Sequence, residues 1–357
     1  RPVLGWGPDQ FRLAFGQHKG AEFVQSAGRG LTADSAHNLP LNLAVGVGLP
    51  GAVLIVVVLS TIVWLSARAI VRRGGGHARI CMLAYLAGLV AQLVNLLFNV
   101  SNSGTGLYVW LFAGALLALL VRERKFELLA VRPTVAGVAM VAAVVLTVWA
   151  STMLLADHQF RNSRFLSPGI ARPIPMERAV RLNPLSIRYR TELGGAYSDA
   201  MTAAGAVFGP ASDESRTYAV KSEHSMREAI ELSPKDVNNY RNLASLLNQF
   251  TARFGEDRSE AAREIALAGL EVSPNTPQLH RDAAIALIRL NRSDEAVEYA
   301  GRATELDSKW VAAWITLGDA LVSAGETDEA VDVYLRVLEI SPDDTWAPQQ
   351  IELLTDQ

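Results

Sequence analysis

The chain has 357 residues, half of them hydrophobic, and a formal net charge of −3. Residues 1–156 hold 12 Lys/Arg against 5 Asp/Glu, a formal +7, whereas residues 157–357 hold 21 against 31, a formal −10. The small net charge therefore conceals a basic, apolar first half and an acidic, polar second half. An acidic second half argues against a nucleic acid as its partner, because phosphate contacts require a surplus of Lys and Arg.

The start of the chain and its single cysteine say little about the compartment. Cys81 lies inside an apolar run, and one cysteine excludes an intrachain disulfide. The first residues, RPVLGWGP, read as a loop and lack the three regions of a signal peptide. We interpret residues 1–157 as a fragment of a larger membrane domain and expect further spans upstream.

Four apolar runs predict transmembrane helices, because about 20 apolar residues cross a hydrocarbon core roughly 30 Å thick. They follow a predicted outward loop at residues 1–44 and cover residues 45–67, 79–100, 106–121 and 134–156. The first half is thus expected to be a polytopic helical membrane domain of an all-α protein. Four buried helices of a large soluble protein are the alternative.

The charges between these runs predict their orientation, since Lys and Arg collect on the cytoplasmic side. Four arginines lie at residues 68–79 and four Lys/Arg at residues 122–132, whereas residues 101–105 carry none. This alternation places both basic connections in the cytoplasm. By parity, residues 1–44 and everything after residue 157 face outward from the cytoplasmic (inner) membrane, in a multi-pass protein.

The second run carries four amides at helical spacing, Gln92, Asn95, Asn99 and Asn102. Intervals of 3, 4 and 3 residues place them on one face of a helix. Amides inside a bilayer face protein or water rather than lipid. Two interpretations remain open, namely hydrogen bonds between helices and the polar wall of a substrate cleft.

The second half contains a repeat. The phrases RLNP, ELSP, EVSP, ELDS and EISP recur, and the last three are 34 residues apart. The last repeat resembles a tetratricopeptide repeat through Trp314, Leu317, Gly318, Ala330, Tyr334 and Pro342.

The repeats predict an α-solenoid over residues 176–357, following a linker at residues 158–175. We expect a helix near 176–183, about four helix pairs from 185 to 342, and a terminal helix. The insertion near 205–216 is predicted to be a loop. Such arrays present a concave surface to protein partners, and a purely spacing role is the alternative.

Standard catalytic and metal-binding motifs are absent from the sequence. There is no G-x-S-x-G, no H-E-x-x-H, no phosphate-binding G-x-x-x-x-G-K and no cysteine-based metal site. His224 and His280 have no metal-ligand spacing around them. We therefore predict no metal and no cofactor, and residues 1–44 remain as the place to look for chemistry.

An ordered set of residues in this segment and just after it is similar to the C-terminal core of the O-antigen ligase family. The matching residues are Gly5, Gly7, Phe11, Ala36, His37, Asn38, Gly48, Leu49, Pro50 and Gly51. The resemblance covers about residues 1–122, and some members of the family carry an appended repeat domain. It implies a membrane glycosyltransferase that moves a glycan from undecaprenyl-diphosphate to an acceptor hydroxyl on the outer face of the membrane.

The resemblance also implies roles for individual residues. His37 would act as general base on the acceptor hydroxyl or orient it, and an imidazole suits either role. Arg12 and Arg29 are the local candidates to bind the diphosphate. Asn38 is a candidate for support, and so is Asp34, which could substitute for an acidic residue that this chain lacks.

The acceptor stays open, because this chain departs from the family's pattern. Gly46 stands where many relatives have an acidic residue, and Leu39-Pro40 replaces a pair that is often polar or aromatic. A lipid, a glycan or a protein acceptor would make the enzyme a ligase, a polymerase or a protein oligosaccharyltransferase. The rival from another class is a membrane-anchored scaffold without chemistry, in which the array is the whole function.

Overall fold

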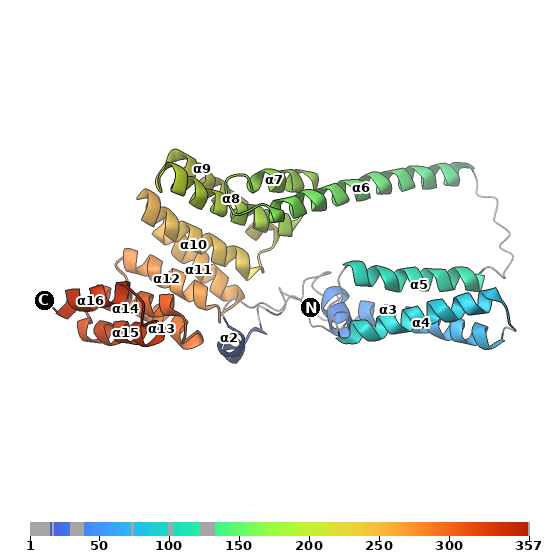
Figure 1. Ribbon diagram of the computed structural model, residues 1–357, viewed down its shortest axis with the longest axis horizontal. Coiled ribbons are helices and arrows are strands. Elements are labelled where there is room, and N and C mark those ends of the chain that lie inside the picture. The colour runs from blue at the N-terminus through green and yellow to red at the C-terminus, as the bar shows by residue number, and fades with distance from the viewer. Residues whose placement is uncertain are drawn as a thin grey trace. The chain divides into compact units, whose positions relative to one another are not determined.

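The described residues of this computed structural model form α-helices joined by turns and short irregular connections (Figure 1). They comprise Phe15 and residues 18–28, 39–72, 75–98, 103–121 and 133–355. The chain divides into two compact units, one of residues 1–15 and 32–139 and the other of residues 16–31 and 140–357. Each unit is described by itself.

Three mutually contacting helices form the first unit. They are α3 (Leu39–Arg72), α4 (His77–Phe98) and α5 (Ser103–Val121). Their shared hydrophobic core is formed by Leu59, Ile62, Ile70, Met82, Leu89, Leu96, Val109, Ala113 and Leu116.

The outer surfaces of these helices are apolar as well. Val53, Leu54 and Ile80 are among the large hydrophobic side chains that stay exposed, as expected of helices that are apolar all round. Two stretches, Val47–Arg72 and His77–Leu97, are long and apolar enough to cross a membrane by length and composition. The structure places helices at the other two predicted spans, and their crossing of a membrane stays a prediction.

Helix α3 is broken near its start. Gly48 has φ 76° and ψ 168°, outside helical geometry, and Pro50 follows it inside the helix. A positive φ favours glycine, and a proline cannot donate the backbone hydrogen bond of a helix interior. The apolar stretch of α3 therefore begins at a backbone break.

The predicted linker at residues 158–175 is wrong over its first half. Helix α6 runs without interruption from Pro133 to Phe165, so only residues 166–172 separate it from α7 (Pro173–Leu182). Ala156 and Phe160 of α6 are buried against Met176 of α7 and Tyr189 of the next helix. The fourth apolar run thus continues as a helix into the core of the repeat array.

The array contains the predicted four helix pairs and terminal helix. The pairs are α8 (Ile187–Phe208) with α9 (Asp213–Leu232), α10 (Val237–Phe254) with α11 (Ser259–Val272), α12 (Pro277–Arg289) with α13 (Ser293–Leu306), and α14 (Val311–Ala324) with α15 (Thr327–Ile340), followed by α16 (Trp346–Thr355). The predicted loop at residues 205–216 is present but shorter, because α8 and α9 leave only residues 209–212 between them.

Local sequence explains where these helices begin and how they pack. The side chains of Ser186, Ser212 and Asp236 accept backbone N–H bonds at the starts of α8, α9 and α10, as N-caps do. Fully buried alanines, such as Ala283 and Ala300, occupy positions where helices cross. Small residues there let the helices of successive pairs approach closely.

Candidate protein-interaction surface

The first helices of successive pairs lie next to one another. Contacts join α8 to α10, α10 to α12 and α12 to α14. Each of these first helices has two adjacent residues at its crossing with the second helix of its pair. The residues two positions before them are Thr191, Arg241, Arg281 and Ile315. Because they hold equivalent repeat positions, they stack along one side of the solenoid. We call these four half-buried residues the inner column.

Hydrogen bonds tie the first helices together along this side. Thr191 Oγ1 donates to Asn239 Oδ1 at 2.8 Å, and Asn248 Nδ2 donates to the backbone oxygen of Asp282 at 2.9 Å. Arg281 Nε donates to the backbone oxygen of Ala312 at 3.3 Å. The inner column therefore rests on neighbours that are themselves fixed, which suits a preformed binding surface.

Two arginines of the inner column act on a buried carboxylate. Asp282 is 3% exposed, and its Oδ1 lies 3.6 Å from Nη1 of Arg281. Burial raises the pKa of Asp282 to about 7, against the opposing charges of Arg281 and Arg241. Burial also lowers the pKa of Arg241. A buried acid with a perturbed pKa beside two cations is a common mark of a functional site.

A segment from the predicted outward loop lies on the array. It comprises residues 18–28 and includes the short helix α2 (Ala21–Ala27), which contacts α13. Asn275 Nδ2 donates to the backbone oxygen of Lys19 at 2.9 Å, and Gln25 Nε2 donates to that of Glu305 at 3.1 Å. Val24 is 1% exposed.

Lys19 of this segment is buried and lies close enough to Arg241 to be affected by its charge. Its side chain is 7% exposed, and its pKa is lowered by burial and by the charge of Arg241. The contact between residues 18–28 and the array thus reaches the neighbourhood of an inner-column arginine.

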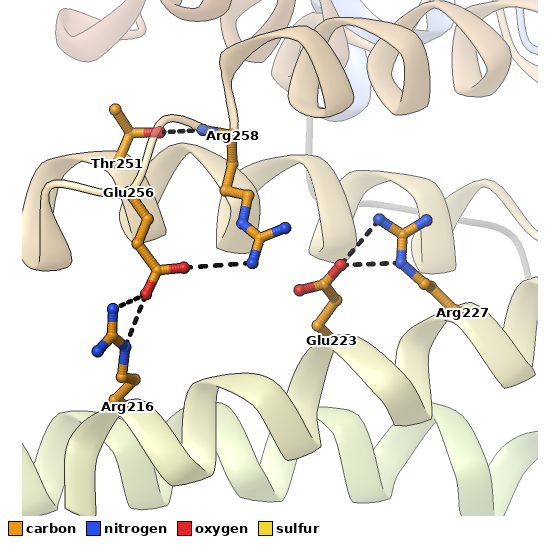
Figure 2. Close-up of polar contacts among 6 residues, drawn as sticks. All are labelled: Arg216, Glu223, Arg227, Thr251, Glu256 and Arg258. Carbon is orange, nitrogen blue, oxygen red and sulfur yellow. Dashed lines mark hydrogen bonds and ion pairs between the residues drawn. The ribbon is translucent and has the colours of Figure 1, made fainter. Parts of the chain in front are cut away.

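Ion pairs on the second helix of the first pair brace the array. Glu256, in the turn between α10 and α11, accepts a bond from Arg216 Nε at 2.6 Å and one from Arg258 Nη2 at 3.2 Å (Figure 2). Arg216 and, to a lesser extent, Arg258 lower the pKa of Glu256. The same view shows Glu223 pairing with Arg227 one turn along α9. We assign these contacts to structure, because they join α9 to the turn before α11 and link neighbouring turns of α9.

Most of the predicted transferase residues lie outside the described part of the chain. This holds for Arg12, Arg29, Asp34, His37, Asn38, Asn99 and Asn102. Gln92 is half-buried and Asn95 is exposed on α4, and both make polar interactions. Within the described ranges no group of three or more His, Cys, Asp or Glu could hold a metal ion.

Reasoning from the sequence missed the charged cluster of the inner column. Repeat alignment places Arg241 and Arg281 at equivalent positions, which was a usable signal. No signal in the sequence indicated that Asp282 beside them is buried, because an aspartate within a helix pattern normally faces solvent.

Comparison with known proteins identifies the array. A tetratricopeptide repeat family model matches residues 281–345. The chain carries a tetratricopeptide repeat domain. It is 34% identical over 82 residues to the small glutamine-rich tetratricopeptide repeat-containing protein 2 of Mycosarcoma maydis, and 34% identical over 87 residues to the SGT1 homolog of Oryza sativa subsp. japonica. The matches cover 23% and 24% of this chain and the same shares of those relatives.

Solved structures similar to the chain include two bacterial proteins. MamA from Desulfovibrio magneticus has a TM-score of 0.43 and 14% identity, over 54% of this chain and 97% of that one. A thermophilic tetratricopeptide protein of Thermus thermophilus has a TM-score of 0.40 and 16% identity, over 58% of this chain and 100% of that one.

Proposed function

We propose that this protein is a membrane-anchored tetratricopeptide scaffold whose array holds a protein partner at the membrane surface. The inner column carries the proposal, because it presents Arg241 and Arg281 beside a row of first helices that are already fixed. Two stretches with the length and composition of membrane spans support the anchor.

The chemistry of the inner column indicates the partner. Arg241 and Arg281 suit a protein segment that carries carboxylates, since guanidinium groups bind carboxylates in two parallel hydrogen bonds. Ile315 extends the column with an apolar contact. The expected partner is therefore an acidic protein segment with a hydrophobic residue next to its carboxylates.

Site-specific photo-crosslinking in the host tests this proposal. A photoreactive residue at Ile315 should capture a specific protein, whereas the same residue at the exposed Glu264 of α11 should not. The further change Arg281→Glu should abolish the adduct at Ile315, because it reverses a charge that the partner needs. Identical adducts at both positions, or an adduct that survives Arg281→Glu, would contradict the proposal.

A second candidate function is glycan transfer of the O-antigen ligase type. One observation favours it, namely the break of α3 at Gly48, within the G-L-P-G letters that carry the family resemblance. A broken helix at membrane depth is tolerated where the backbone is buried in protein or lines a cavity. The acceptor would be a lipid, a glycan or a protein.

Replacing the predicted base tests this candidate in the full-length protein. His37→Ala should stop glycan transfer and cause the undecaprenyl-diphosphate-linked donor to accumulate, at an unchanged level of protein in the membrane. His18→Ala changes an exposed histidine of the same loop and should leave transfer intact. Unchanged transfer in His37→Ala would remove the transferase hypothesis.

A further inference from the structure

The charge of the array reverses along its length. Residues 157–190, which directly follow the fourth apolar run, hold seven arginines and two acidic residues, whereas residues 191–357 hold 14 Lys/Arg and 29 Asp/Glu. The basic part thus belongs to α7, to the start of α8 and to the end of α6.

Helix α7 presents a basic and apolar outer face. Its inner face buries Met176, Ala179 and Val180. Ile174, Arg178 and Arg181 follow one another at intervals of 4 and 3 residues and are exposed, which places them together on the opposite face.

The turn after α7 continues this surface. Leu185 is 77% exposed, and Arg188 is exposed at the start of α8. We call Ile174, Arg178, Arg181, Leu185 and Arg188 the basal face.

Other arginines nearby are neutralised, whereas those of the basal face are not. Arg172 pairs with Asp199, and Arg190 pairs with Glu228. In the described part of the chain no ion pair joins Arg178, Arg181 or Arg188 to a carboxylate. Their charge is therefore available to an anionic partner.

Contacts of α6 place Arg188 of the basal face beside the end of the apolar run. Phe160 stacks on Tyr189 with ring centroids 5.2 Å apart, and the guanidinium of Arg188 lies 4.6 Å from the centroid of the Phe160 ring. Phe160 is three residues, or about 4.5 Å of helix, beyond Asp157, the first charged residue after the run. In a membrane-inserted α6 this is the depth of the lipid headgroups.

We propose that the basal face rests on the anionic headgroups of the bilayer that α6 enters, with Leu185 inserted among them. Clustered arginines beside a span bind anionic lipid phosphates, and an exposed leucine at this depth removes its apolar surface from water. The inference rests on the membrane anchoring of the proposed function, with the predicted crossing by α6, and adds a lipid-binding surface to it.

Quenching by labelled lipids tests the proposal on the full chain. In a Cys81→Ser background, one fluorophore is attached at Leu185→Cys or, as the control, at Val207→Cys. Val207 is 68% exposed and lies near the end of α8, so the two sites are similarly exposed, one just before the start of α8 and the other near its end. The protein is reconstituted in phosphatidylcholine vesicles with or without phosphatidylglycerol, and a headgroup-attached nitroxide serves as quencher.

We expect quenching at position 185 and little at position 207. Phosphatidylglycerol should strengthen the quenching at 185, and high salt should weaken it, because salt screens exposed charges. The combined change Arg178→Gln, Arg181→Gln and Arg188→Gln should remove the effect of phosphatidylglycerol.

Flotation of the vesicles after an alkaline wash separates the possible failures. Protein that does not float overturns the anchoring itself and, with it, the inference. Protein that floats overturns the inference alone in two cases. Either quenching is equal at both positions, or quenching at position 185 does not depend on phosphatidylglycerol. Capture of a protein by a photoreactive residue at 185, without quenching, would assign the basal face to a protein partner instead.

Discussion

Asp282 shows how one buried residue ties the stability of the array to pH. Its pKa in the folded chain, about 7, lies above the ordinary value of 3.8, so the folded state binds this proton more tightly than the unfolded state does. The buried carboxyl therefore destabilises the folded state least below pH 4, where it is protonated in both states. Its penalty grows as the pH rises to about 7 and then stays constant.

The change Asp282→Asn should remove this pH dependence. The wild-type chain should lose stability between pH 5 and pH 8 relative to the variant, by an amount on the order of 1–3 kcal/mol. Thermal unfolding of the full chain in detergent at both pH values measures the difference. Asp294→Asn, at an exposed position of α13, is the matched control and should follow the wild type. A variant at 282 that keeps the wild-type slope would refute the assignment.

Gly318 is a second residue whose identity the packing dictates. A Cβ at this position would lie 2.5 Å from Cε1 and 2.7 Å from Cζ of Tyr334. The Tyr334 ring is fully buried, and its hydroxyl donates to Asp319 Oδ1 at 2.8 Å. The ring therefore has nowhere to move.

Gly318→Ala should consequently destabilise the array by about 1–3 kcal/mol. Gly301→Ala makes the same change inside α13, where a Cβ meets nothing within 4 Å, and should stabilise it by about 0.5–1 kcal/mol through helix propensity. Chemical denaturation of both variants gives the comparison. Equal effects of the two changes would show that propensity, rather than Tyr334, sets the outcome at 318.

At the scale of elements, the docked segment at residues 18–28 makes a direct prediction. Val24→Asn places an amide at a buried position and should release α2 from the array, because a buried amide without partners is costly. Ser26→Asn, at an exposed position two residues later, should leave α2 docked. Hydrogen–deuterium exchange of the peptide covering residues 18–28 reports release as faster exchange. Equal exchange in both variants would mean that Val24 does not hold the segment.

The elements themselves could be predicted where their sequence is periodic. The repeat phrases indicated the number of helix pairs, since each pair needs its neighbours to bury its apolar face. The prediction errors lay in the connections between helices. The letters A-V-F-G-P-A-S at residues 206–212 look like a loop, yet α8 retains its helix to Phe208 because Gly205 and Ser215 pack there, with Ser215 Oγ donating to Met201.

The linker prediction failed for a related reason. Residues 158–165 are polar and follow an apolar run, a pattern that suggests the end of a span. Tertiary burial of Phe160 decides otherwise, and no local signal reports it. The docking of residues 18–28 was equally invisible, because its partners Asn275 and Glu305 lie more than 250 positions away.

At the scale of the whole molecule, membrane anchoring can be tested through cysteine chemistry. In a Cys81→Ser background, Val90→Cys lies on the exposed surface of α4, in one of the two span-like stretches. In native membranes it should resist a water-soluble maleimide and react once detergent is added. Gly75→Cys, in the turn before α4, should react from the aqueous side. Ready labelling at 90 in intact membranes would contradict a bilayer around α4.

The continuity of α6 makes the orientation of the array sensitive to the length of one helix. Each residue of an α-helix contributes about 100° of rotation and 1.5 Å of rise. Removing a single residue between Trp149 and Ala156 would turn the first repeats by more than a quarter of a circle about the helix axis. Removing two residues would turn them, and the inner column with them, by slightly more than half a circle. The register of this helix thus sets the rotation of the first repeats about the axis of α6.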